Sequence, residues 1–184
     1  MSAAPATIAP DALAGRWEVD PAHSAVEFRV RHAGVARVRG SFDLFEGELV
    51  VAPGGAITAR GAIDAASLTT RLGVRDEHLR SSDFLDVERH PRIGFASTTV
   101  KAGADGGITM LGELTIRGVT RAIELTGEIV GRGFDDDGAE RLGLALEGRL
   151  DRRDYGLTWN AAVEGGGMLV GNRVDVALEI SAVR

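Results

Sequence analysis

Cysteine is absent from this chain of 184 residues. Its absence excludes disulfides, thiol nucleophiles and thiolate metal ligands together. Runs of basic residues are missing as well, and a net charge of -6 argues against a general nucleic-acid binder. Proline is scarce, at 5 residues, so the chain is not a disordered low-complexity sequence despite its 25 glycines.

Long apolar runs are also lacking. No run approaches the roughly 20 residues that a helix needs to span a bilayer. Residues 1–15 are rich in Ala and Pro, with neither a basic start nor a continuous apolar core, so no secretory signal is visible. We expect a loose N-terminal arm over residues 1–15, a single domain over residues 16–184 and a cytoplasmic protein.

Common catalytic and nucleotide-binding motifs are missing too. The chain has no G-x-S-x-G elbow and no G-x-x-x-x-G-K-[ST] loop. Structural zinc sites need tight ligand clusters, often with cysteine, whereas the four histidines stand at no short ligand spacing within one element: His23, His32, His78 and His90. We therefore predict no metal site and no cofactor.

Period-two alternation of apolar and polar residues is the main pattern that the chain does contain. In one predicted strand, the apolar face carries Val26, Phe28, Val30 and His32. The alternation recurs in the segments 57–64, 108–116, 123–129, 142–150 and 174–180. One apolar and one polar face is typical of an antiparallel sheet. The pattern predicts an all-β fold of about eight or nine strands, closed as an up-and-down barrel that leaves no exposed edge.

Four glycines fall on the apolar face of the predicted strands: Gly61, Gly112, Gly127 and Gly148. Glycine at such positions relieves strand coiling at the corners of a barrel. It also removes side-chain volume, and an eight-stranded barrel is close to the size at which the interior holds one ligand. Both interpretations remain open on the sequence alone.

Residues 74–95 depart from the strand pattern. They gather charged residues and two histidines around Leu79 and Phe84. We predict a short helical insert that lies over the barrel mouth as a lid, with these two apolar side chains as its seal. Its polar side chains have two open roles, pinning the helix to the barrel or contacting a ligand head group: Arg75, Asp76 and His78.

Several motifs occur in a fixed order along the chain: WEVDPAHS (17–24), GSF (40–42), RDEHL (75–79), DF (83–84), HPRIGF (90–95), GELTIRGVT (112–120) and DYGL (154–157). Together they resemble the YceI-like family of bacterial lipid-binding proteins over about residues 16–183. The resemblance implies a lipocalin-like antiparallel β-barrel with a long apolar tunnel that holds a polyisoprenoid or a similar amphiphile. Many members of that family are periplasmic.

Inward-facing and mouth residues are the candidate ligand contacts, although core packing alone also explains any single one of them. We predict ligand binding by Val26, Phe28, Val30, His32, Phe42, Ile63, Arg75, Leu79, Phe84, Phe95, Met110, Leu144 and Trp159. Met168 would extend an adaptable wall. His32 suits a hydrogen-bonded structural histidine or a head-group contact, and His23 a turn.

We predict a non-enzymatic protein that binds, transports or stores an elongated apolar ligand, such as an isoprenoid, a quinone or a fatty-acid-like molecule. One alternative is an enzyme that acts on an apolar molecule with an acid/base group made of His32, Arg75 and Asp76. Another is the sequestration of antibiotic-like or secondary-metabolite molecules. The expected partner is thus a small apolar or amphiphilic ligand and not a nucleic acid, and the sequence allows a homodimer on the outer barrel face.

Overall fold

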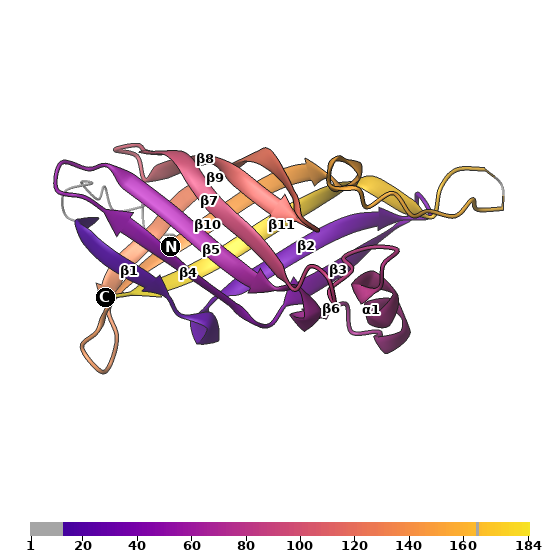
Figure 1. The fold of residues 1–184 in the computed structure, drawn as a ribbon. Helices are drawn as coiled ribbons and strands as arrows, with labels where there is room; N and C mark the ends of the chain where they lie inside the picture. Colours follow the sequence, from indigo (N-terminus) through magenta and orange to yellow (C-terminus); the bar gives the residue numbers. More distant parts are fainter. Residues whose placement is uncertain (1–12, 165) are drawn as a thin grey trace.

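Antiparallel strands make up most of the described chain, residues 13–164 and 166–184, in this computed structural model (Figure 1). The strands are β1 (Gly15–Val19), β2 (Ala25–His32), β3 (Ala36–Phe42), β4 (Phe45–Val51), β5 (Ile57–Asp64), β6 (Leu68–Thr69), β7 (Arg92–Ala102), β8 (Gly107–Ile116), β9 (Val119–Phe134), β10 (Glu140–Asp151) and β11 (Val170–Val183). The helical elements are α1 (Gly73–Arg80) and the 3₁₀ helices Pro21–His23, Ala65–Ser67 and Arg152–Tyr155. Within the described residues no helix is long and apolar enough to cross a membrane.

The sheet closes into a ring of eight strands in the order β1-β4-β5-β7-β8-β9-β10-β11, because β11 also pairs with β1. β2, β3 and β6 continue the sheet from β11 toward one end of the barrel. All pairings between these strands are antiparallel, which confirms the predicted barrel. Ring closure leaves these strands without a free edge, so the alternating pattern acquires one enclosed apolar side.

A bend between β1 and β2 lets this segment pair with β4 on one side of the bend and with β3 on the other. The Asp20 carboxylate makes the bend by accepting the Ala22 N–H at 3.0 Å and by contacting His23 Nδ1 at 2.7 Å. This confirms His23 as a turn residue. Arg141 on β10 binds the same carboxylate at 2.7 Å, and Arg141 and His23 together lower the pKa of Asp20 to about 2.

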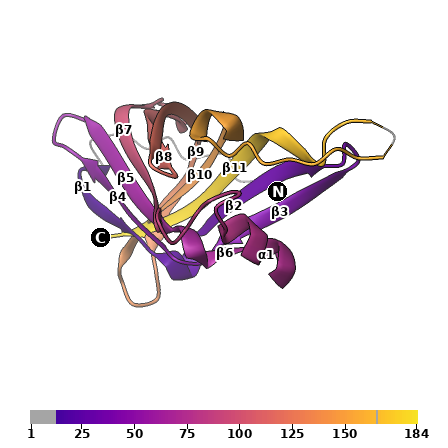
Figure 2. The same cartoon turned by 45° about the vertical axis from the view of Figure 1, so that its right-hand side comes forward.

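The ring is incomplete at the end of the barrel where β5 ends and β7 begins, in the interval between β6 and β7. β6 pairs with β3 there, while the pairing of β5 with β7 ends at Asp64 and Arg92. The chain between β6 and β7 leaves the sheet and forms α1 and the turns that follow it. Figures 1 and 2 show α1 beside β6 and β3 at this end of the barrel. The structure thus confirms a short helical insert where the strand pattern fails.

Two apolar clusters lie toward the two ends of the barrel. One surrounds Trp17, whose side chain is fully buried and whose indole Nε1 donates to the Leu13 carbonyl at 2.8 Å. Arg184 lies over the indole ring, 4.5 Å from its centroid. Residues 13–15 therefore belong to the barrel and not to a loose arm, while residues 1–12 of the predicted arm lie outside the described residues. The second cluster packs against α1.

Three of the four inward glycines mark close approach and not free space. A Cβ on Gly127 would lie 1.9 Å from the Ala145 carbonyl oxygen, and Cβ atoms on Gly112 and Gly148 would lie 2.5 and 2.6 Å from neighbouring side chains. Gly61 differs, because it lines the interior cavity and its Cβ would come no nearer than 3.3 Å to another atom. The cavity interpretation therefore fits Gly61, whereas the other three glycines make room for backbone or side-chain atoms of a neighbouring strand.

Gly127→Ala should destabilise the barrel by about 1–3 kcal/mol or more, because the new methyl group would overlap the β10 backbone. Gly131→Ala on the same strand is the matched control, since its Cβ would meet no atom of the described residues within 4 Å. Chemical denaturation measures both free energies of unfolding. Equal stability of the two variants would show that β9 and β10 do not approach this closely.

Candidate functional site

An apolar cavity of about 560 Å³ runs along the inside of the barrel, and side chains of both clusters form its wall. On β11 its lining extends from Val170 to Ala182. This stretch covers about 40 Å of strand, or about 30 Å along the axis of a barrel with ordinary strand tilt. Spread over that length, the volume makes a narrow channel, hereafter the tunnel.

The structure brings all of the predicted ligand-binding residues together in the wall of this tunnel: Val26, Phe28, Val30, His32, Phe42, Ile63, Arg75, Leu79, Phe84, Phe95, Met110, Leu144 and Trp159. Nine of them come from strands far apart in the sequence, and the period-two rule places these nine on one side of the sheet. Arg75 and Leu79 instead lie on α1, and Phe84 and Trp159 lie outside the strands. Their contact with a ligand stays a prediction. Met168 was wrongly expected in the wall, because its side chain is 62% exposed and lies outside the lining.

Asp76 fastens α1 to the barrel. Its carboxylate accepts the Thr70 N–H at 2.8 Å, the Thr70 hydroxyl at 2.5 Å and the Thr69 hydroxyl at 3.3 Å. Burial acts to raise the pKa of Asp76, but these hydrogen bonds outweigh it and hold the pKa below its ordinary value. Asp76 is buried and does not line the tunnel, so its role is to pin the helix.

The Arg75 side chain contacts both Thr70, beside the helix, and the tunnel. Its Nε donates to the Thr70 hydroxyl at 2.7 Å and its Nη2 to the Thr70 carbonyl at 3.0 Å. The same side chain lines the tunnel, and within the described chain no hydrogen bond reaches its Nη1. Arg75 therefore braces the helix and also offers a cationic donor to the tunnel.

A cluster of three aromatic rings lines the tunnel beneath α1. The His78 ring meets Trp159 edge-on at 4.5 Å and Phe84 at 5.1 Å between centroids, and Phe84 lies 5.4 Å from Trp159. Asp83 Oδ2 contacts His78 Nε2 at 2.9 Å and fixes the ring. Phe84 is buried and Leu79 packs in the same cluster, so both predicted apolar anchors lie at the helical end of the tunnel.

Arg152 is one of the tunnel residues that the sequence pattern did not single out. Its buried guanidinium donates to the carbonyls of Leu157 at 2.5 Å, Trp159 at 2.9 Å and Gly171 at 2.9 Å, with longer contacts to Val170 and Asn172. Burial lowers the pKa of Arg152 against the opposing effect of the Asp151 carboxylate. These bonds hold the Trp159 segment against β11. If the alternation of inward and outward residues on β10 is extended by two residues beyond Leu150, it places Arg152 on the inner face.

His32 lies in the tunnel wall near the helical end, on the strand β2. Among the described residues no hydrogen bond to its ring is found, so the expected hydrogen-bonded structural role is not supported. The alternative acid/base group of His32, Arg75 and Asp76 is not assembled in one place. Asp76 bonds Thr69 and Thr70 outside the tunnel wall, whereas His32 and Arg75 line the tunnel. The described residues contain no group of three or more His, Cys, Asp or Glu that could hold a metal ion.

Comparisons with known sequences all point to one family. The YceI-like domain matches residues 17–182. A UPF0312 protein of Yersinia enterocolitica is 32% identical over 177 residues, covering 94% of this chain and 88% of that protein. A UPF0312 protein of Pectobacterium atrosepticum is 37% identical over 151 residues, covering 80% of this chain and 78% of that protein.

Solved structures share the fold at lower identity. BcnA of Burkholderia cenocepacia superposes with a TM-score of 0.72 at 18% identity, covering 89% of this chain and 98% of that one. A polyisoprenoid-binding domain from Saccharophagus degradans, implicated in plant cell wall breakdown, gives a TM-score of 0.65 at 15% identity, with coverage of 91% and 97%. At these identities the comparison establishes the barrel fold alone.

Asp76→Ala should destabilise the protein by about 1–3 kcal/mol, because the N–H and hydroxyl of Thr70 lose a buried acceptor. The native pKa of Asp76 is depressed, so its stabilisation is present above the unfolded-state pKa and is lost as the pH falls through the native one. The variant should therefore also show a shallower loss of stability in acid.

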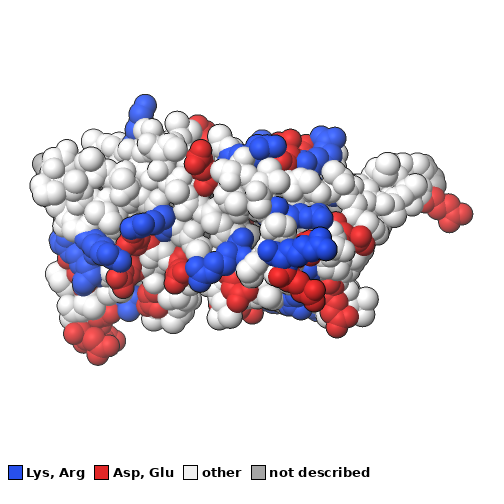
Figure 3. Space-filling view, viewed as in Figure 1, with Lys and Arg blue, Asp and Glu red and all other residues white. Residues whose placement is uncertain are grey.

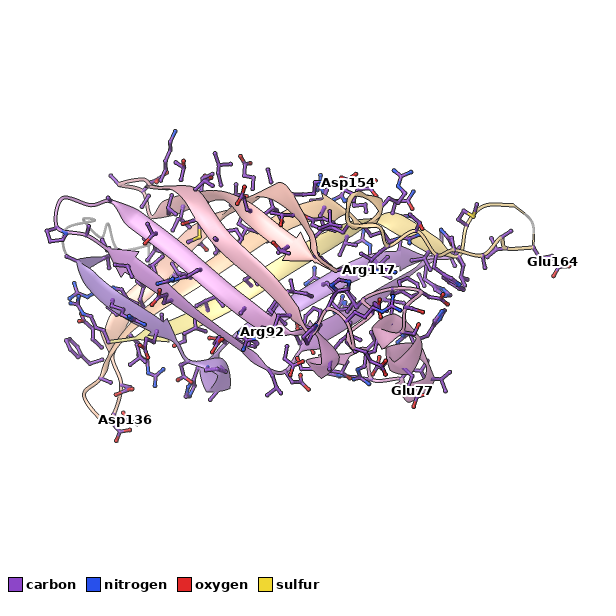
Figure 4. The ribbon with its side chains drawn as sticks, in the orientation of Figure 1. Glu77, Arg92, Arg117, Asp136, Asp154 and Glu164 are labelled. Carbon is purple, nitrogen blue, oxygen red and sulfur yellow. The ribbon has the colours of Figure 1, made fainter. Side chains whose placement is uncertain are left out.

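Glu77→Ala is the matched control, because this neighbouring side chain is exposed and points away from the barrel in Figure 4. Denaturant unfolding of both variants between neutral and acidic pH measures the difference. Equal stability and equal acid sensitivity of the two variants would contradict the pinning role of Asp76.

Proposed function

Because the chain belongs to the YceI-like family, we propose that it is a non-enzymatic protein that binds an elongated apolar or amphiphilic molecule inside the barrel and carries or stores it. The apolar tunnel is the observation that supports this proposal, since it runs through the barrel with polar groups near its helical end. A polyisoprenoid-binding domain among the solved structures of this fold adds support for an isoprenoid ligand.

The driving force in such a tunnel is the burial of a hydrocarbon chain. Each buried methylene contributes about 0.8 kcal/mol, so a long tail offsets the cost of association before any head-group contact is made. The narrow cross-section and the long lining on β11 favour a flexible chain over a compact, drug-like molecule. An isoprenoid, a quinone with an isoprenoid tail and a fatty-acid-like molecule all have this shape.

The tunnel orients such a ligand. The end near Trp17 is packed with apolar side chains, whereas the helical end carries His32 and Arg75. A polar head is better solvated and better bonded at the helical end, so the tail points toward Trp17. The cytoplasmic location and the homodimer stay predictions, which cell fractionation and sedimentation analysis would check.

Organic extraction of the purified protein, followed by mass spectrometry, tests the ligand class. Recovery of an amphiphile with a long tail, together with binding of isoprenoid quinones or prenyl phosphates, is the expected result. Recovery of no amphiphile and no affinity for these probes would refute the proposal. Recovery of a compact polycyclic molecule would instead support sequestration of secondary metabolites.

Ala59→Phe should weaken binding of a long-chain probe by at least tenfold, because the new ring would occupy the tunnel. Losing contact with only two methylenes already costs about 1.6 kcal/mol. Thr58→Phe is the matched control, since Thr58 is the exposed neighbour of Ala59 on the same strand and does not line the tunnel. Fluorescent fatty-acid titration measures both affinities, and equal binding by the two variants would contradict an interior site.

Arg75→Met should weaken binding of a prenyl phosphate about tenfold and leave binding of the matching prenyl alcohol nearly unchanged, because only the phosphate makes a charge-assisted hydrogen bond. Stability should fall by about 1 kcal/mol with the loss of the bonds to Thr70. Isothermal titration with the two ligands separates these effects. An equal change for both ligands would assign Arg75 to the lid alone.

A further inference from the structure

The β2–β3 hairpin carries four arginines on its outer face. The register places Arg29 opposite Arg39 and Arg31 opposite Arg37. Like charges directly across an antiparallel pair are destabilising. Two such pairs in succession reduce the stability of the isolated protein, and an anionic partner that binds the hairpin would remove this repulsion.

These arginines lack carboxylate partners within the described residues. Asp175 is the cross-strand neighbour of Arg29, but its carboxylate is occupied by Arg149 at 3.2 Å and Arg173 at 2.7 Å. In the part of the chain that the structure describes, the Nε of Arg29 is buried without a hydrogen bond, and the Arg31 side chain bonds only the Gly34 carbonyl, at 3.3 Å.

A polar groove of about 430 Å³ crosses the outside of the barrel beside the hairpin. Its basic residues are Arg29, Arg37, Arg149 and Arg173, and its acidic residues are Glu124, Glu147 and Asp175. The acids Glu124 and Glu147 lie on β9 and β10, away from the hairpin. The hairpin side of this outer surface is therefore locally basic on a chain whose net charge is -6.

The helical end of the tunnel also exposes apolar side chains. Of the eight large apolar residues exposed in the described chain, four lie at this end: Val35 at 92%, Val74 at 80%, Met168 at 62% and Leu72 at 52%. Leu72 and Val74 line the tunnel. Figures 1 and 2 show the β2–β3 hairpin and the loop before β11 projecting together beyond the barrel, and the Ala33 N–H joins them by donating to the Leu169 carbonyl at 2.7 Å.

We propose that this apolar rim and the hairpin arginines dock the protein on the surface of an anionic lipid bilayer, with the tunnel mouth against the lipid. The inference rests on the proposed function, because a long-tailed ligand resides in a bilayer and would pass between bilayer and tunnel without crossing water. Exposed apolar side chains insert among the head groups, and guanidinium groups bind lipid phosphates.

The position of the charges supports this orientation. The pair of Arg31 and Arg37 lies next to the turn that carries Val35, and the pair of Arg29 and Arg39 lies about 7 Å farther along the strands. Arginines at these depths reach phosphates while the rim inserts. An acidic protein partner would account for the arginines and not for the apolar rim that continues into the tunnel. Figure 3 shows mixed charges over the barrel and a mostly uncharged projecting loop, with Glu164 at its tip in Figure 4.

Vesicle co-sedimentation of the full chain tests the proposal, with phosphatidylcholine vesicles that contain or lack phosphatidylglycerol. Binding should require phosphatidylglycerol and weaken with salt. Replacing Arg31 and Arg37 together by Gln should weaken it about 30-fold, since each basic residue at an anionic surface contributes about 1 kcal/mol. Val35→Ser with Val74→Ser should weaken it further.

Arg16→Gln with Lys101→Gln is the matched control. It removes the same charge from the opposite end of the barrel, near the Trp17 cluster, and should leave vesicle binding within twofold of the original. Failure of the unmodified protein to bind anionic vesicles, or an equal loss in both double variants, would overturn the proposal.

Ligand binding in detergent-free solution, measured on the same samples, separates this proposal from the tunnel function. Normal ligand affinity without vesicle binding would overturn the docking surface and leave the tunnel function standing. Vesicle binding without ligand affinity would overturn the tunnel function and leave the docking surface standing. Binding to polyglutamate but not to anionic vesicles would assign the arginines to an acidic polypeptide instead.

Discussion

The pairing of β11 with both β10 and β1 is the constraint on which the rest of the structure depends. It turns a twisted sheet into a ring, so that the inner faces of the strands enclose one continuous volume. Trp17 and its neighbours fill one end of that volume. Apolar side chains line the middle, which leaves a narrow space that a hydrocarbon chain fits.

The same ring is not completed by strands at its other end, and this incompleteness gives the barrel a mouth. The chain leaves the sheet after β6 and returns as β7, and α1 occupies the interval. A carboxylate pins the helix there, with Asp76 buried against Thr69 and Thr70. Aromatic rings line the tunnel beneath the helix, and Arg75 bridges the lid and the tunnel. The polar residues at the mouth thus hold a lid, and Arg75 also faces the site where a head group would lie.

The sequence was enough to predict the barrel and the strand residues of its wall, because alternation fixes which side of a sheet each residue occupies. Close contacts between neighbouring strands cannot be predicted from alternation. The 1.9 Å approach to Gly127 depends on the path of β10, and Met168 lies on an exposed loop that has no alternation to follow. Arg152 obeys the alternation, but the five acceptors that make its buried position possible come from segments that alternation does not place beside it. The roles of Arg75 and Asp76 needed side-chain directions, which period alone does not provide.

The central claim is that one elongated molecule occupies the tunnel with its tail toward Trp17 and its head beside His32 and Arg75. A crystal structure of the protein purified from the cells that produce it tests this claim most directly. The account predicts continuous, unbranched electron density through the barrel, widening only at the helical end. A tunnel filled by ordered water, or closed by side chains that meet across it, would contradict the account.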